Sequence, residues 1–105
     1  PVRRLDLADW GTLTFFRPDD EAFPAMQAAR NALERGGVAP AALNGANEAA
    51  VGLFLQGKLP FLRIAELAEA ASLAQPAGEG SPSLEEILEA DRAARAFVLS
   101  HAGTE

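Results

Sequence analysis

Asn44, Asn47 and Glu48 are the residues whose types and spacing best suit chemistry in this chain. At positions i, i+3 and i+4 of a helix they share one face, so two amides can hold a carboxylate that acts as a general base or a ligand. In the structural alternative, Asn44 caps a helix and the other two lie in its first turn, where a carboxylate favours the helix dipole. No second catalytic group accompanies Glu48, so the residues favour the structural interpretation.

The acidic run Asp19-Asp20-Glu21 and the single histidine, His101, are weaker candidates for a metal site. The acidic run precedes a predicted helix, where the helix dipole stabilises negative charge. His101 lies in the final turn of the last predicted helix, where a cation is favoured, and the sequence offers it no second ligand. Both features are therefore interpreted as helix-end residues.

The central predicted helix runs from about Asn44 to Gln56, and Gly57 supplies a left-handed C-cap. Its apolar residues point in nearly every direction, which is typical of a helix buried on most sides. We therefore expect Leu53 and Phe54 to lie in the core, and the stripe that begins with Asn44 and ends at Leu55 to point into the protein.

Three further helices are predicted around this one. The first has Pro24 in its first turn, ends at Gly36-Gly37 and carries an apolar stripe of Phe23, Met26, Ala29 and Leu33. The next starts at Pro60, and its stripe contains Phe61, Ile64, Ala68 and Ala71, with Leu67 beside them. The last begins with a capping box of Ser83 and Glu86, and its face contains Ile87, Ala90, Ala94, Phe97 and His101.

Residues 2–16 are the only stretch with strand character, because apolar and polar residues alternate on both sides of Gly11. This stretch forms two short strands or an extended arm that needs a surface to lie against, with Trp10 as a packing anchor. The predicted fold is therefore all-α. An extended or short β N-terminal arm, residues 1–19, precedes a four-helix-bundle-like domain, residues 20–105.

Composition limits the function further. The chain has 105 residues, enough for one domain, and a net charge of −6, which argues against nucleic-acid binding. It has no cysteine, which excludes disulfides and Cys-based zinc sites. No apolar run reaches the ~18 residues of a membrane helix, and no signal peptide is visible. We expect a cytoplasmic protein without a membrane partner.

The segment Leu43-Asn44-Gly45-Ala46-Asn47-Glu48 resembles the LNAANE segment near the C-terminus of the 1-deoxy-D-xylulose 5-phosphate reductoisomerase family. Other segments also resemble that family: Leu5-Asp6-Leu7, Leu13-Thr14-Phe15, Pro18-Asp19, and Leu84-Glu85-Glu86-Ile87-Leu88 followed by Asp91 and Ala94-Arg95. Gly45 replaces the family's usual Ala, which should loosen the first helical turn. Since the chain begins with Pro1, the resemblance favours a piece of a longer protein.

The resemblance implies a function for the intact protein. Family members convert 1-deoxy-D-xylulose 5-phosphate to 2-C-methyl-D-erythritol 4-phosphate in isoprenoid precursor biosynthesis, use NADPH and a divalent cation (Mg or Mn), and are usually homodimers. The family's catalytic, cofactor and metal residues lie upstream, so we predict no catalytic, cofactor-binding or metal-binding residue in this chain. It would be an inactive supporting domain that packs on upstream domains. The alternatives are a free-standing helical interaction module and a small enzyme that uses Glu48.

Overall fold

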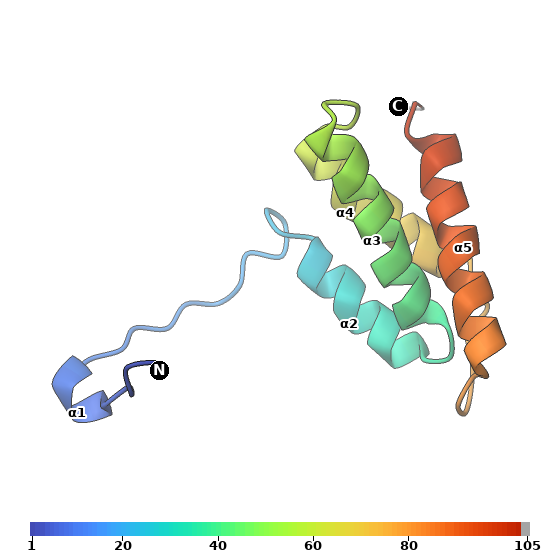
Figure 1. Ribbon diagram of the computed structural model, residues 1–105. Helices are drawn as coiled ribbons and strands as arrows, with labels where there is room; N and C mark the ends of the chain where they lie inside the picture. The colour runs from blue at the N-terminus through green and yellow to red at the C-terminus, as the bar shows by residue number, and fades with distance from the viewer. Residues whose placement is uncertain (104–105) are drawn as a thin grey trace.

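The structure, a computed structural model, describes residues 1–103, in which five helices are joined by irregular segments (Figure 1). The helices are α1 (Leu7–Trp10), α2 (Ala25–Arg35), α3 (Ala39–Leu55), α4 (Phe61–Leu73) and α5 (Leu84–His101). Helices α2 to α5 gather around α3, which contacts each of the other three, whereas α1 lies away from them at the end of an extended segment (Figure 1). The all-α prediction is confirmed. The sequence predicted no membrane-spanning helix. Among the described residues, no helix combines the length and the hydropathy needed to cross a bilayer.

Local sequence signals set most helix ends where they were predicted. Gly36 (φ 67°) ends α2, and Gly57 (φ 72°) follows α3, both in the left-handed region that glycine adopts without strain. At the start of α5, Ser83 Oγ accepts a hydrogen bond from the Glu86 N–H at 3.2 Å, and Glu86 Oε2 accepts one from the Ser83 N–H at 2.7 Å. The predicted capping box is confirmed.

Helix α3 begins earlier than predicted, at Ala39 rather than at Asn44. Pro40 lies in its first turn, where a missing backbone N–H costs nothing because that N–H has no partner within the helix. Val38 is the N-cap residue, without a side-chain cap. Asn44 is therefore inside the helix, and the prediction that it caps α3 is wrong.

Small residues form most of the core of the helical part. The buried positions of α3 are Ala39, Ala42, Gly45, Ala46 and Ala50. Larger buried side chains come from the neighbouring segments: Leu59, Ile64, Leu67 and Val98. Because Ala side chains are small, neighbouring helices can pack closely against α3. Helix α3 is therefore central, although it is not covered on every side.

Two predicted apolar faces are largely exposed. Phe54 is 37% exposed and Leu55 is 76% exposed, so the prediction that α3 is buried on most sides is wrong at its C-terminal end. Phe54 instead meets Phe61 of α4 edge to face, with 5.8 Å between ring centroids. On α2, Leu33 is 75% exposed, while the buried residues are Ala28 and Ala32. The α2 stripe was thus assigned to the wrong face.

The predicted faces of α4 and α5 are mostly correct. Ile64, Leu67, Ala68 and Ala71 are buried, and so are Ala90 and Ala94, whereas Phe61 is 64% exposed.

Hydrogen bonds join the C-terminal end of α2 to that of α4, and α4 to the start of α3. The Arg35 guanidinium donates to the carbonyl oxygens of Ser72 at 3.2 Å and of Gln75 at 2.6 Å, and so satisfies backbone acceptors at the end of α4. The buried Ser72 hydroxyl donates to the Ala39 carbonyl at 3.0 Å. These bonds fix the ends of α2 and α4 relative to the start of α3.

The N-terminal arm contains no strand within the described residues, so the expectation of short strands is wrong and that of an extended arm holds. The Asp6 side chain accepts a hydrogen bond from the Ala8 N–H at 2.9 Å and caps the single turn of α1. Trp10 is 64% exposed and Phe16 is 89% exposed, so Trp10 does not anchor the arm on the helices. The arm therefore presents large apolar side chains without cover.

Candidate functional site

The polar segment singled out in the sequence faces two ways along α3. Asn44 and Asn47 lie on the side toward α2 and α4, where they line a groove. Gly45 and Glu48 lie on the side toward α5, where they meet Asp91 and Arg95. The expected single cluster of two amides and a carboxylate is therefore not formed. In an α-helix, residues i and i+3 can share one side while i+1 and i+4 share the next.

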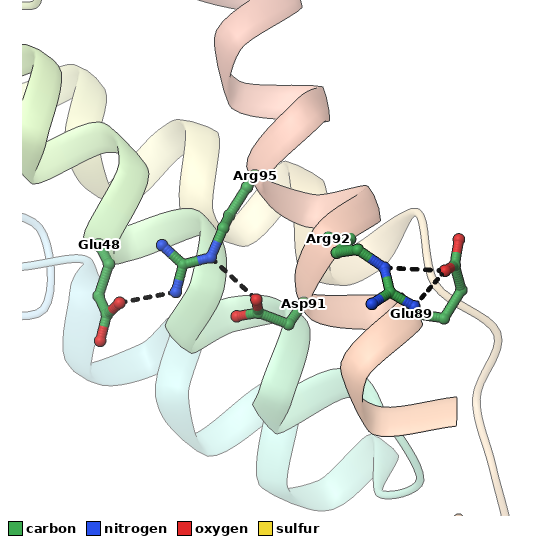
Figure 2. Close-up of polar contacts among 5 residues, drawn as sticks. All are labelled: Glu48, Glu89, Asp91, Arg92 and Arg95. Carbon is green, nitrogen blue, oxygen red and sulfur yellow. Dashed lines mark hydrogen bonds and ion pairs between the residues drawn. The ribbon is translucent and has the colours of Figure 1, made fainter. Parts of the chain in front are cut away.

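Arg95 of α5 links Glu48 to Asp91 (Figure 2). Its Nη2 lies 2.7 Å from Glu48 Oε2, and its Nε lies 2.9 Å from Asp91 Oδ2. Hydrogen bonds raise the pKa of Arg95 above its usual value, and the bond to Asp91 has a larger effect than the bond to Glu48. A second pair on the same helix, Arg92 and Glu89, stays within α5 (Figure 2). The Glu48 carboxylate is thus used to join α3 to α5.

Gly45 allows α3 and α5 to approach each other at this link. A Cβ atom added to Gly45 would lie 3.1 Å from the main-chain oxygen of Asp91 and in contact with its carboxylate. Gly45 is buried well inside α3 rather than in the first turn. The expectation that it loosens a first turn is therefore wrong, and its role is close helix packing.

A groove of about 470 Å³ runs between α2, α3 and α4. It is lined by Ala25, Ala28, Ala29, Ala32, Leu33, Pro40, Leu43, Asn44, Asn47, Ala65 and Ala68. None of these side chains is charged, and only the two amides are polar. Within residues 1–103, no hydrogen bond is formed by the side chain of Asn44 or Asn47, and both are exposed. The groove can bind an apolar group but offers no acid, base or nucleophile.

The other candidate residues have local roles. His101 Nδ1 lies 2.8 Å from the Phe97 carbonyl oxygen, and its ring stacks on Phe97 with 4.0 Å between centroids. Asp19 Oδ1 accepts a hydrogen bond from the Ala22 N–H at 3.0 Å, within a turn that precedes α2. These contacts are local: those of His101 are with the last turn of α5, and that of Asp19 is within its own turn.

Two features of residues 1–103 bear on a metal or dinucleotide site. Within residues 1–103, no three His, Cys, Asp or Glu side chains converge as ligands of one ion would. The same residues contain no strand, so they form no strand-to-helix loop of the kind that holds a pyrophosphate. That this chain contains no catalytic, cofactor-binding or metal-binding residue stays a prediction.

The sequence of this chain matches the model of a known protein family. Residues 1–97 match the family model of the DXP reductoisomerase C-terminal domain. The chain belongs to this family. In this chain, the Leu43–Glu48 segment lies within α3.

Individual relatives agree with this assignment. The chain is 53% identical over 95 residues to the 1-deoxy-D-xylulose 5-phosphate reductoisomerase of Dechloromonas aromatica, an alignment covering 90% of this chain and 23% of that protein. It is 47% identical over 98 residues to the enzyme of the same name from Gloeobacter violaceus, covering 93% of this chain and 25% of that protein. The chain thus spans about a quarter of the length of the curated relatives it matches.

A solved structure shares the fold. The 1-deoxy-D-xylulose 5-phosphate reductoisomerase from Zymomonas mobilis, in complex with NADPH, matches with a TM-score of 0.83 and 35% identity. The match covers 100% of this chain and 28% of that chain, so it includes the arm as well as the four packed helices.

Proposed function

We propose that this chain is the C-terminal part of a 1-deoxy-D-xylulose 5-phosphate reductoisomerase and that it supports the reaction without performing it. The observation that carries the proposal is the match of residues 1–97 to the C-terminal domain of that family. The solved relative supports it, because its structure resembles this chain over the arm and the helices alike.

The intact enzyme would isomerise and reduce 1-deoxy-D-xylulose 5-phosphate to 2-C-methyl-D-erythritol 4-phosphate, with NADPH as the hydride donor and Mg or Mn as the divalent cation. The NADPH complex of the Zymomonas mobilis relative supports the choice of cofactor. We assign both groups to the upstream part of the polypeptide, because within residues 1–103 no three potential ligands converge and no strand-to-helix loop is formed. The role of this chain is then to provide a stable helical body, held by the Arg95 link and the Ala-rich core.

We further propose that residues 1–19 are a linker arm and residues 20–105 a helical domain, within a cytoplasmic homodimer. The exposed apolar side chains of the arm support this division, because Phe15 (86% exposed) and Phe16 (89% exposed) require a surface that the helices here do not provide. The upstream domains of the same polypeptide are the partner that the linker would reach first.

The test uses the full-length polypeptide that contains this chain. We expect it to oxidise NADPH only when both 1-deoxy-D-xylulose 5-phosphate and Mg or Mn are present. The oxidation is monitored as the loss of nicotinamide absorbance. The product should co-elute with 2-C-methyl-D-erythritol 4-phosphate. A full-length protein that oxidises no NADPH under these conditions would refute the assignment.

The second candidate is a free-standing helical interaction module, which the uncovered groove between α2, α3 and α4 favours. The codons upstream of Pro1 separate the two candidates. An initiator codon directly before Pro1 favours the module, and a long open reading frame that encodes a dinucleotide-binding fingerprint favours the reductoisomerase.

A further inference from the structure

We propose that the groove between α2, α3 and α4 is a docking site for an apolar, uncharged segment from the upstream part of the same polypeptide, with Asn44 and Asn47 hydrogen-bonding the main chain of that segment. This inference rests on the proposed function, because it requires a longer polypeptide. It adds which face of the helical domain meets the rest of the protein and what chemistry that face recognises.

The lining of the groove selects an apolar occupant. Charged residues make up 23% of the chain, yet the groove lining contains none. Leu33 stands at its edge with 75% of its surface exposed, and Ala29 beside it is also exposed. Burying a charged side chain here would leave the charge without a partner, whereas an aliphatic or aromatic side chain would remove apolar surface from water.

The two side-chain amides can orient a bound segment by hydrogen bonding to its main chain. Asn44 and Asn47 are one helical turn apart on the groove side, and each amide offers both a donor and an acceptor. The main chain of an extended segment offers the same two groups in alternation, so it can satisfy both residues. Glu48 is not available for this purpose, because its carboxylate is bound to Arg95 on the other side of α3.

The arm ties the upstream polypeptide to the N-terminal end of α2. Ala25, the first residue of α2, is itself part of the groove lining, and the chain N-terminal to it leads away as the arm (Figure 1). In the proposed longer polypeptide, the part before Pro1 is therefore covalently linked to the groove through residues 1–24. This link raises the effective concentration of the upstream part at the groove. The curated relatives have about three times as much additional chain as this segment.

A second copy of the chain is a weaker occupant. Each copy carries a net charge of −6, and this charge opposes association of two copies. The tethered upstream segment also docks without the entropy loss of bringing two molecules together.

Backbone hydrogen exchange in the full-length polypeptide and in the 105-residue chain tests the proposal. We expect amides of residues 25–33 and 41–47 to exchange at least tenfold more slowly in the full-length protein. Leu33→Glu should abolish this difference by placing a charge at the edge of the groove. Leu55→Glu is the matched control, since Leu55 is 76% exposed and lies outside the groove, and it should leave the difference intact. Circular dichroism of both variants in the 105-residue chain confirms that each remains folded.

Several outcomes would overturn the proposal. Equal exchange in the two proteins shows that no upstream segment covers the groove. Protection that rises with the concentration of the 105-residue chain assigns the groove to a second copy, and protection lost on deleting residues 1–19 from that chain assigns it to the chain's own arm. NADPH oxidation by the wild-type full-length protein is scored separately: an active protein with equal exchange rejects the docking site alone, and an inactive protein with slower exchange rejects the reductoisomerase assignment alone.

Discussion

Replacing Gly45 by Ala tests the close contact between α3 and α5. The new methyl group would meet the Asp91 carboxylate, which can rotate, and the Asp91 main-chain oxygen at 3.1 Å, which moves only if α5 moves. Rotation of the carboxylate would also disturb the bond between Asp91 Oδ2 and Arg95 Nε. Because the substitution adds only one methyl group, we expect the variant to fold, but with a shifted α5.

Two opposing contributions set the magnitude. Ala is favoured over Gly in a helix interior by about 1 kcal/mol. Overpacking a well-packed contact costs about 1–3 kcal/mol. The expected net result for Gly45→Ala is a loss of about 0–2 kcal/mol of unfolding free energy.

Gly52→Ala is the internal control, because Gly52 lies in the same helix and an added Cβ would meet no atom within 4 Å beyond its chain neighbours and the nearby backbone of α3. It should gain about 0.5–1 kcal/mol from helix propensity alone. The two variants should therefore differ by about 0.5–3 kcal/mol.

Urea unfolding followed by far-ultraviolet circular dichroism measures this difference. With a slope of about 1–3 kcal/mol/M, a difference of that size separates the two midpoints clearly. In an Asp91→Ala background the cost of Gly45→Ala should shrink, since the carboxylate that must move is gone. Equal stabilisation by Gly45→Ala and Gly52→Ala would refute the contact between Gly45 and α5.

Three further predictions concern stability. Glu48→Gln should lower the urea midpoint slightly at low salt and leave it unchanged at about 1 M salt, because this ion pair is solvent-exposed and screened; a large loss at both salt concentrations would contradict that account. Phe54→Ala should cost about 1–2 kcal/mol by the same assay, since the ring is only partly buried, against about 2–5 kcal/mol for Leu67→Ala in the core; the reverse order would contradict the burial pattern. Ser83→Ala should cost about 1 kcal/mol by removing the capping box, and an unchanged melting temperature would show that the cap is not formed.

The helix ends were predictable from sequence because their causes are local. A glycine that must adopt positive φ, as at Gly36 and Gly57, or a capping pair such as Ser83 and Glu86, acts within a few residues. The start of α3 was missed because Pro40 was interpreted as part of a connection, although the first turn of a helix also accepts proline.

The faces of the helices were less predictable because burial depends on partners. On α2 the large residues suggested the core, yet Ala28 and Ala32 are buried and Leu33 is exposed. An amphipathic pattern shows that a face needs cover but not which molecule or segment provides it. The same holds for the arm, whose alternating residues resemble a strand but have no neighbouring strand among the described residues.

The candidate site was predictable only in part. The residue types of Asn44, Asn47 and Glu48 suggested one polar cluster, and the structure separates them because α3 has different neighbours on its two sides. From the sequence, Arg95 has no predicted role beyond the resemblance of its segment to the family's last helix. Its partnership with Glu48 joins residues 47 positions apart, a separation at which no local pattern operates.

NADPH oxidation dependent on 1-deoxy-D-xylulose 5-phosphate, measured side by side in three proteins, tests the central claim most directly. The proteins are the full-length polypeptide, the same polypeptide ending before residue 25, and the 105-residue chain alone, each with Mg or Mn. We predict turnover by the full-length protein, a loss of most of that turnover on truncation, and none by the 105-residue chain. Turnover by the 105-residue chain, or undiminished turnover without its helices, would contradict the proposal that this domain supports the reaction without performing it.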